Sequence, residues 1–219
     1  MHYTDQTILN FKKMIALNLN YLNKKLRNKT AEEIIEWALM LSNKRIVTTS
    51  FGSYSAVLLN EISKKDNAIK TIWCDTGYNT EETYKHALDL IHDLHLNIHI
   101  YKPLQDKNVT DTICNPINTY DEEQTKFKEI VKLEPFRRAL KQHGPEIWFT
   151  NIRSGQTEHR NALDILSYSK DGILKISPFY YSSDIDLDHY LKTNKLPKND
   201  TYFDVTKVLK HKECGIHFQ

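Results

Sequence analysis

Short apolar segments that alternate with helical segments limit the fold of this sequence more than any other feature. Five such segments follow one another along the chain: RIVTTS (45–50), IKTIWC (69–74), NIHIY (97–101), EIWFTN (146–151) and ILKISP (173–178). Runs of this length are typical of buried strands, whereas a helix needs about ten residues or more. Because helical patterns separate them, the sequence predicts an α/β fold with a doubly wound, mainly parallel sheet of about five strands.

The helices between these strands are predicted from their patterns. Residues 53–65 and 80–96 fit helices, and so do 126–143, where we expect a break near Pro135. The polar segment 106–124 is predicted to be irregular.

Further helices are expected outside the alternating part of the chain. Residues 4–28 and 30–42 have helical patterns, and Thr30 with Glu33 matches a capping box at the start of the second. Residues 184–194 are predicted to form a short helix, followed by a tail that is rich in loops.

Composition excludes several classes of protein. Hydrophobic residues make up 40% and charged residues 26% of the 219 residues, a globular mixture, and the net charge of +2 argues against a nucleic-acid partner. No apolar run approaches the roughly 18 residues that span a bilayer, and the first residues lack the pattern of a signal peptide, so we expect a cytoplasmic protein without a membrane partner. The three cysteines are too few and too far apart for a disulfide scaffold or a four-cysteine cluster: Cys74, Cys114 and Cys214.

Glycine and arginine are rare, and they gather in polar clusters. Of the six glycines, four lie in TTSFGSYS, CDTGYN, RSGQTEHR and ECGIH. Three of these clusters (50–55, 75–78 and 151–160) directly follow predicted strands, so we expect them at the edge of the sheet where such folds bind ligands. Arg153 and Arg160 offer a bidentate geometry that suits phosphate or sulfate. From composition alone, scattered surface charges explain these arginines equally well.

The segment from Ser50 to Ser55 opens a helix, so its backbone amides can hold an anion. Its spacing matches a pyrophosphate loop of the form SGGxDS, with Ser50, Gly52 and Ser55 retained and Phe51 and Tyr54 substituted. Loss of the Asp disfavours ATP pyrophosphate chemistry, and a plain strand–helix turn is the alternative. The segment 75–78 either caps the next helix or contacts a ribose or base.

Cys214 is the candidate nucleophile, because HKECGIH surrounds it with cationic side chains that favour the thiolate. Structural cysteines sit in apolar surroundings, as Cys74 does in its strand, whereas Cys114 lies in a polar segment without an evident partner. Zinc ligation by Cys214, His211 and His217 matches no standard spacing, so we predict no metal site.

Together these clusters resemble the phosphoadenosine phosphosulfate (PAPS) reductase family over about residues 45–219. The resemblance is carried, in order, by Ser50-Phe51-Gly52, by Asp75-Thr76-Gly77-Tyr78 with Glu82-Thr83-Tyr84, by Lys132-Leu133-Glu134-Pro135 with Arg138-Ala139-Leu140, by Arg153, Gln156 and Arg160, and by Glu213-Cys214-Gly215-Ile216-His217.

The resemblance implies an adenine nucleotide alpha hydrolase-like fold and reduction of PAPS to sulfite through a sulfonate on Cys214. It implies no bound cofactor, reduced thioredoxin or glutaredoxin as electron donor, and a homodimer. Carried over residue by residue, it implies a substrate site made of Ser50, Phe51, Gly52, Ser55, Asp75, Thr76, Gly77, Lys132, Arg138, Arg153, Gln156, Arg160 and His217. It also implies a single domain with N-terminal helices (1–43), a nucleotide-binding core (44–180) and a tail that carries the catalytic cysteine (181–219).

The sequence departs from the family pattern at three places. Ser154 stands where a second Arg often follows the first, the stretch before Cys214 is short, and 105–125 holds no cysteine pair, which argues against the iron–sulfur subgroup that reduces adenylyl sulfate. The preference between the two sulfonucleotides stays open. Two alternatives remain beside a reductase: an ATP-using enzyme of the same fold that adenylates or inserts sulfur into nucleic acid, and a nucleotide-binding module without catalysis.

Overall fold

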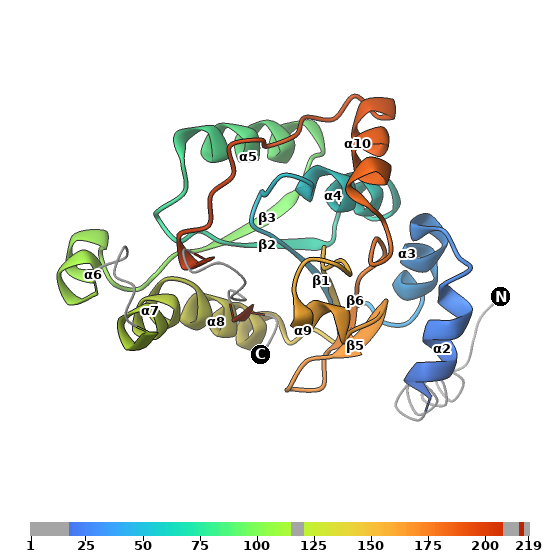
Figure 1. Ribbon diagram of the computed structural model, residues 1–219, viewed down its shortest axis with the longest axis horizontal. Helices are drawn as coiled ribbons and strands as arrows, with labels where there is room; N and C mark the ends of the chain where they lie inside the picture. The colour runs from blue at the N-terminus through green and yellow to red at the C-terminus, as the bar shows by residue number, and fades with distance from the viewer. Residues whose placement is uncertain (1–17, 115–120, 208–214, 217–219) are drawn as a thin grey trace.

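A six-stranded sheet in the order β3-β2-β1-β4-β6-β5 forms the centre of the molecule (Figure 1). The computed structural model describes residues 18–114, 121–207 and 215–216. All neighbouring strands pair in parallel except β5 and β6, which are antiparallel. The predicted α/β fold with a mainly parallel sheet is therefore confirmed. The strands are β1 (Arg45–Thr49), β2 (Lys70–Cys74), β3 (Asn97–Tyr101), β4 (Ile147–Phe149), β5 (Leu166–Tyr168) and β6 (Leu174–Ile176).

The sixth strand, β5, is the strand that the sequence analysis missed. It has only three residues, too few to show a strand pattern of their own. It forms because the chain turns back at Gly172, whose φ of 78° lies in the left-handed region, and pairs Leu166 with Ile176. The outer side of β5 is covered by Asn23, whose side chain donates to the Leu166 carbonyl and accepts from the Leu166 amide at 3.0 and 2.8 Å.

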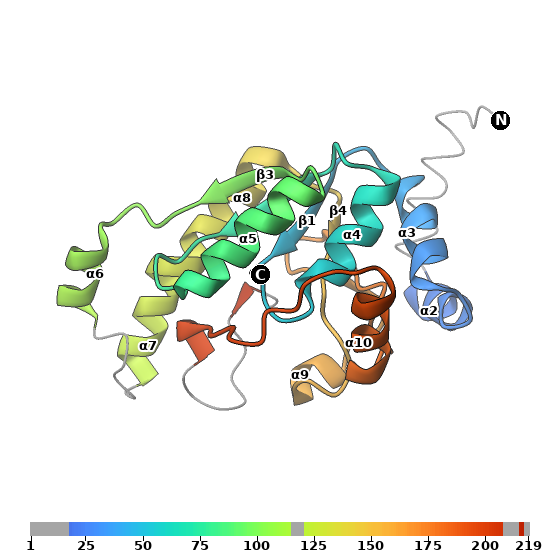
Figure 2. The same ribbon diagram turned by 90° about the horizontal axis from the view of Figure 1, so that it is seen from above.

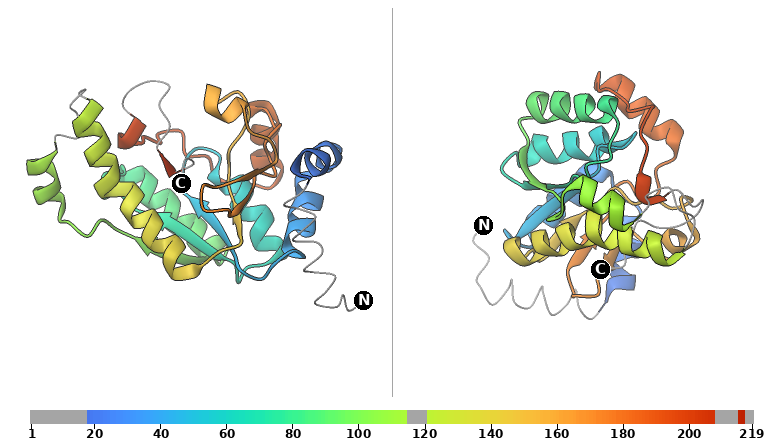
Figure 3. Two further views of the ribbon diagram at one scale, coloured as in Figure 1. Left: turned by 90° about the horizontal axis from the view of Figure 1, so that it is seen from below. Right: turned by 90° about the vertical axis from the view of Figure 1, so that its left-hand side faces the viewer.

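Helices cover both faces of the sheet (Figures 2 and 3). On one face lie α4 (Ser55–Lys65) and α5 (Glu81–Asp93), and on the other lies α8 (Glu134–His143). The remaining helical segments are α2 (Leu19–Leu26), α3 (Ala31–Leu39), α6 (Lys107–Ile113), α7 (Asp121–Lys128), η1 (Glu129–Leu133), α9 (Glu158–Asn161), α10 (Asp184–Thr193) and η2 (Val205–Lys207). Within the described ranges, no helix is long and apolar enough to cross a membrane.

The strands read as continuous apolar runs because both of their faces are buried. Val47, Trp73 and Phe149 belong to the large core under α4 and α5. Their immediate neighbours Ile46, Ile72 and Trp148 belong to a second core under α8. Alternate side chains of one strand therefore enter different cores, as expected for parallel strands covered by helices on both sides.

The chain reverses its direction across the sheet once. From β1 it proceeds outward through α4, β2 and α5 to β3, and it then returns under the sheet through α7 and α8 to β4, which pairs with the other side of β1. The carboxyl ends of β1 and β4 thus flank the point where the strand order reverses. In open α/β sheets this is the place where a crevice forms and ligands bind.

The connection from β3 to β4 differs from the sequence-based expectation. Residues 107–113 form the helix α6, which the Asp106 carboxylate caps by accepting from the Asn108 amide at 2.8 Å, so this part of the segment is not irregular. The expected break near Pro135 takes the form of a π-helix, η1. Proline has no N–H to donate to the carbonyl four residues earlier. The helical turn just before it is wider than an α-helical turn and holds one extra residue.

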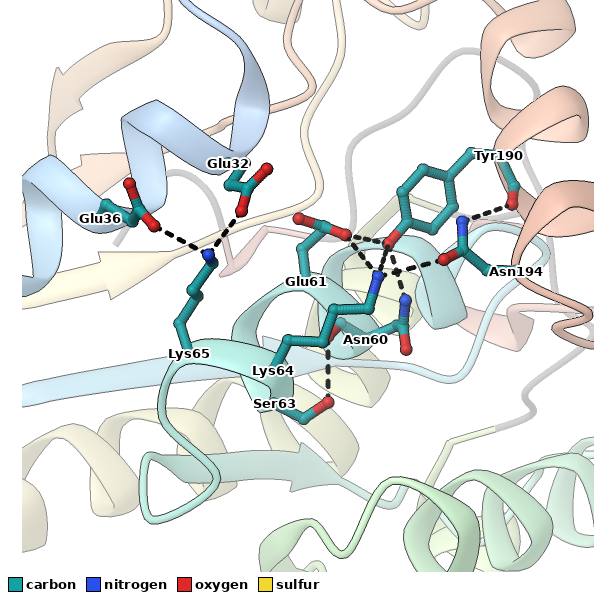
Figure 4. A network of polar contacts seen from close by, with 9 residues as sticks. All are labelled: Glu32, Glu36, Asn60, Glu61, Ser63, Lys64, Lys65, Tyr190 and Asn194. Carbon is teal, nitrogen blue, oxygen red and sulfur yellow. Dashed lines mark hydrogen bonds and ion pairs between the residues drawn. The ribbon is translucent and has the colours of Figure 1, made fainter.

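A polar network fixes α4 between α3 and α10 (Figure 4). The Lys65 ammonium lies 2.5 Å from Glu32 and 2.7 Å from Glu36 on α3. On the other side, the Tyr190 hydroxyl of α10 donates to Glu61 and accepts from the Asn60 amide. The network holds the start of the C-terminal segment against the core. The predicted capping box at Thr30, which starts α3, is confirmed.

Candidate functional site

A pocket of about 350 Å³ lies where the strand order reverses, between the carboxyl ends of β1 and β4. Its walls come from the β1–α4 turn, the segment after β4, the π-helix and the C-terminal tail. It is lined by Thr48, Thr49, Ser50, Gly52, Ser53, Tyr54, Ser55, Leu58, Leu59, Ile72, Cys74, Lys132, Phe136, Asn151, Arg153, Gln156, Arg160, Tyr202, Asp204, Lys207 and Ile216.

The β1–α4 turn (residues 50–54) contributes Ser50, Gly52, Ser53 and Tyr54 to the lining of this pocket. Phe51 holds the turn in place with a φ of 50°, a left-handed conformation that costs a bulky residue roughly 1–2 kcal/mol, and its fully buried ring packs edge-on to Trp73. Within the described residues, no group accepts a hydrogen bond from the amides of Gly52, Ser53 and Tyr54. Such free amides at a helix start suit an anion.

Gly52 allows the C-terminal tail to close against this turn. A Cβ at Gly52 would lie 3.3 Å from two ring carbons of Tyr202, closer than most real contacts of this kind. Since Tyr202 also lines the pocket, the tail and the turn form one wall. Figure 1 shows the segment after α10 crossing from the α4 and α5 side of the sheet toward α7, which η2 contacts.

The segment after β4 supplies two arginines joined by a glutamine. The Gln156 side-chain oxygen accepts from the Arg153 amide at 3.0 Å and from the Arg160 guanidinium. Thr157 caps the short helix α9, which carries Arg160. The Arg153 guanidinium lies 2.6 Å from Asp184 and 5.0 Å from the centre of the Tyr54 ring. Both arginines are buried at their pocket positions, so their charges are poorly screened by water.

The π-helix places a buried lysine in the pocket. The Lys132 ammonium donates to Asp204 at 2.6 Å and to the Thr206 hydroxyl at 3.2 Å. Burial by itself would raise the pKa of the Asp204 carboxyl. The charge and hydrogen bond of Lys132, together with the hydrogen bond from Thr206, outweigh this effect and hold that pKa well below its usual range. A charged pair therefore ties the tail to the π-helix.

Cations outnumber anions among the lining residues that the structure describes. The lining includes four cationic side chains and one carboxylate, that of Asp204. The cations are Lys132, Arg153, Arg160 and Lys207. Together with the free turn amides, this excess suits a ligand that carries several negative charges.

The β2–α5 turn (residues 75–79) does not line the pocket, although Asp75, Thr76 and Gly77 were predicted substrate residues. The Asp75 carboxylate accepts from the Gly77 amide, the Asn79 side chain and the Tyr84 hydroxyl at 3.1, 2.9 and 2.8 Å. Burial and this last bond raise the pKa of Tyr84 to about 12. The turn therefore stabilises the start of α5, and Thr80 caps that helix.

Two more predicted substrate residues lie outside the pocket lining. Phe51 is part of the core. The Arg138 guanidinium donates to Glu134 and to the Lys102 carbonyl at 2.8 and 2.6 Å, and it lies over the ring of Tyr101. The predicted residues that do line the pocket are Ser50, Gly52, Ser55, Lys132, Arg153, Gln156 and Arg160.

The predicted nucleophile Cys214 and the predicted sulfate ligand His217 lie outside the described residues. The two residues between them are described. Ile216 lines the pocket, and Gly215, with a φ of 88°, lies so close to Leu133 of the π-helix that a Cβ would meet it at 3.0 Å. Within the described residues, Ile216 of the ECGIH motif therefore reaches the pocket.

The other two cysteines are buried. Cys74 belongs to the core under α8, as expected from its strand, and it also lines the pocket. Cys114 packs with Phe127, Val131 and Val205, so its surroundings are apolar despite the polar sequence around it, and burial raises the pKa of its thiol.

Outside β1 and the β1–α4 turn, four polar lining residues were not predicted from the sequence: Asn151, Tyr202, Asp204 and Lys207. Asn151 is the last residue of the predicted strand 146–151, and the carboxyl ends of parallel strands are where such folds bind ligands. The other three belong to the tail, where no regular pattern indicates which residues return to the sheet.

Comparison with known proteins agrees with this architecture. Residues 44–206 match the family model described as the phosphoadenosine phosphosulfate reductase domain. The phosphoadenosine 5'-phosphosulfate reductase of Vibrio vulnificus (strain CMCP6) is 33% identical over 83% of this chain and 70% of its own length. That of Buchnera aphidicola subsp. Acyrthosiphon pisum (strain Tuc7) is 35% identical over 91% of both chains.

Solved structures support the fold. The phosphoadenylyl-sulfate reductase of Candida auris, a phosphate complex, superimposes with a TM-score of 0.72 at 24% identity and 91% coverage of both chains. NMN synthetase from Francisella tularensis gives a TM-score of 0.53 at 13% identity, over 89% of this chain and 76% of its own. The sheet topology, the pocket and these sequence matches lead to one conclusion: the chain belongs to the phosphoadenosine phosphosulfate reductase family.

Proposed function

We propose that this protein reduces PAPS to sulfite and adenosine 3′,5′-bisphosphate. The observation that carries the proposal is the pocket between β1 and β4, where free turn amides, a cationic lining and Ile216, two residues after Cys214 in the sequence, come together. The family to which the chain belongs supports it.

The reaction begins with the Cys214 thiolate, which attacks the sulfur of the sulfonucleotide. An S–S bond forms, the S–O bond to the phosphate breaks, and adenosine 3′,5′-bisphosphate leaves with the electron pair of that bond. The phosphate and sulfate oxygens of the substrate only accept hydrogen bonds. The turn amides, Arg153, Arg160 and Lys132 are donors of the kind that holds them, and His217 is a further predicted ligand of the sulfate.

A dithiol protein completes the cycle. One thiolate of reduced thioredoxin or glutaredoxin attacks the Cys214 sulfur, sulfite leaves, and a mixed disulfide forms. The second thiolate of the donor then resolves this disulfide, so that Cys214 returns as a thiolate and the donor leaves oxidised by two electrons. We propose that this cycle runs without an iron–sulfur cluster and in a homodimer. Iron analysis and light scattering of the purified protein test these two points.

The central experiment measures sulfite release from PAPS by the wild type and by Cys214→Ser. The variant is expected to release no sulfite and to bind adenosine 3′,5′-bisphosphate nearly as the wild type does, because a nucleophile contributes to chemistry more than to ground-state affinity. Cys114→Ser, which changes a cysteine outside the pocket lining, is the matched control and should keep its activity.

Intact-protein mass spectrometry tests the intermediate. Incubated with PAPS alone, the enzyme should gain about 80 Da per chain, the mass of one sulfite group on one thiolate, and reduced thioredoxin should remove it. Turnover by Cys214→Ser would overturn the mechanism. A parallel incubation with adenylyl sulfate determines the nucleotide preference, and pyrophosphate release from ATP would instead support the ATP-using alternative.

A further inference from the structure

Asn151 lies just beyond β4 and lines the pocket beside the β1–α4 turn. Its side-chain Nδ2 donates to the Tyr54 carbonyl at 3.0 Å. A carbonyl oxygen only accepts, so this bond requires the amino end of the amide at that position. The other end, Oδ1, is left to accept a hydrogen bond from something else.

The Oδ1 atom has no partner in the part of the chain that the structure describes, and it is buried. A buried acceptor without a donor destabilises the fold, so most such atoms in proteins are paired. A ligand that supplies a hydrogen-bond donor would pair with this acceptor in the pocket wall and so explain why the protein leaves it unpaired.

The chemistry of the ligand restricts what that donor is, and this step rests on the proposed function. Phosphate and sulfate groups carry no donor when ionised, so Oδ1 would repel them. The donors of a sulfonucleotide are the amino group of adenine and the free hydroxyl of the ribose. Asn151 therefore contacts the nucleoside part of the substrate.

The neighbours of Asn151 favour the ribose. On one side its side chain is bonded to the turn whose free amides suit an anion, and on the other side the chain continues into Arg153, Gln156 and Arg160. In PAPS the ribose lies between two anionic groups, the 5′-phosphosulfate and the 3′-phosphate. The 3′ oxygen is esterified, which leaves the 2′-hydroxyl as the donor.

We propose that Asn151 Oδ1 accepts a hydrogen bond from the ribose 2′-hydroxyl and so determines the preference of this enzyme for a ribonucleotide over a deoxyribonucleotide. The bond to Tyr54 keeps Oδ1 oriented before the substrate arrives, so little conformational freedom is lost on binding.

Calorimetric titration with adenosine 3′,5′-bisphosphate and its 2′-deoxy analogue tests this assignment. The wild type should bind the deoxy analogue about tenfold more weakly, the effect of one hydrogen bond. Asn151→Ala should bind both ligands with equal affinity. Ser154→Ala is the matched control, since Ser154 is not a lining residue and its hydroxyl donates to the Tyr180 carbonyl, and it should keep the tenfold preference.

A third ligand, inosine 3′,5′-bisphosphate, tests the other donor by replacing the adenine amino group. If Asn151→Ala removes the preference for adenine and leaves that for the 2′-hydroxyl, the assignment is wrong. Equal affinity of the wild type for the ribo and deoxy ligands also overturns it, without any variant being needed. Failure of the wild type to bind adenosine 3′,5′-bisphosphate at all would instead overturn the proposed function.

Discussion

The β1–α4 turn and the β2–α5 turn follow neighbouring strands at the same edge of the sheet, yet they differ in where their polar groups point. In the first, the amides of Gly52, Ser53 and Tyr54 have no partner within the described residues and the turn lines the pocket. In the second, the Asp75 carboxylate accepts three hydrogen bonds from its own segment and from α5.

The difference shows that two turns with a glycine and polar residues after a strand can satisfy their polar groups in different ways. β1 lies where the strand order reverses, so the helices on its two sides diverge and leave a crevice. β2 lies between β1 and β3, with no reversal beside it, and its turn closes on itself. The first turn is thus expected to govern affinity and the second to govern stability.

Removing the Asp75 carboxylate should have the largest effect. Asp75→Ala leaves the Tyr84 hydroxyl and two further donors unpaired, and we expect a loss of about 3 kcal/mol of unfolding free energy, measured by urea denaturation. Asp75→Asn retains an acceptor and should lose less. If the folded Asp75→Ala protein binds adenosine 3′,5′-bisphosphate much more weakly than the wild type, the second turn belongs to the site.

Removing a pocket arginine should have the next largest effect, this time on affinity. Arg160→Ala is expected to weaken the binding of adenosine 3′,5′-bisphosphate by roughly 1–3 kcal/mol, the range for a lost charge-assisted contact. Arg160→Lys should recover only part of this, because the bidentate geometry is lost. Arg138 lies outside the pocket lining, so Arg138→Ala should bind as the wild type does. Calorimetry measures both affinities. A loss of affinity in Arg138→Ala and none in Arg160→Ala would refute this placement.

Exchanging the two turn glycines for alanine gives the most direct comparison. Gly77 has a φ of 79° with open space around it, so Gly77→Ala should cost about 1 kcal/mol of stability through backbone strain and leave affinity unchanged. Gly52 has no positive φ, but its Cβ would press against the Tyr202 ring, so Gly52→Ala should lower affinity and disturb the tail. Thermal melts and titrations of both variants separate these effects. Equal behaviour of the two variants would contradict the distinction.

The smallest change is expected from pH, and it concerns the tail segment whose Tyr202 lies against the first turn. Because the pKa of Asp204 is lower in the folded protein than in the unfolded one, its ionised form stabilises the fold above the unfolded value of about 4. That contribution to stability is lost only as the pH falls from the unfolded pKa through the lower pKa of the folded protein. The stability difference between wild type and Asp204→Asn should therefore stay constant between about pH 5 and 8 and shrink in stronger acid. A large change near neutral pH would show that another group controls the tail.

The order of the elements could be predicted from the sequence because each depends on local patterns. Thr30 with Glu33 marks the start of α3, and the apolar runs mark the strands with both faces buried. β5 could not be predicted, because three residues become a strand only by pairing with β6. The π-helix was anticipated as a break near Pro135, but its type depends on packing.

The site could be predicted in part. Gly52, Arg153 and Arg160 were predicted because rare residues follow strands whose carboxyl ends meet, and all three line the pocket. Asp75 was grouped with them since its sequence gives the same signal, and only the hydrogen bonds of the folded turn show where its carboxylate points. Asp204 was missed because its role depends on a contact with Lys132, which is 72 positions away in the chain.

The π-helix η1 has a consequence for how this chain tolerates insertions and deletions. A π-helix is equivalent to an α-helix that carries one inserted residue, and each residue of an α-helix advances by about 100°. Deleting one residue from 129–133 would therefore restore a regular helix and remove the widened turn. Lys132, which contacts Asp204, and Leu133, which lies against Gly215, both belong to that turn, so the docking of the tail depends on the π-helix.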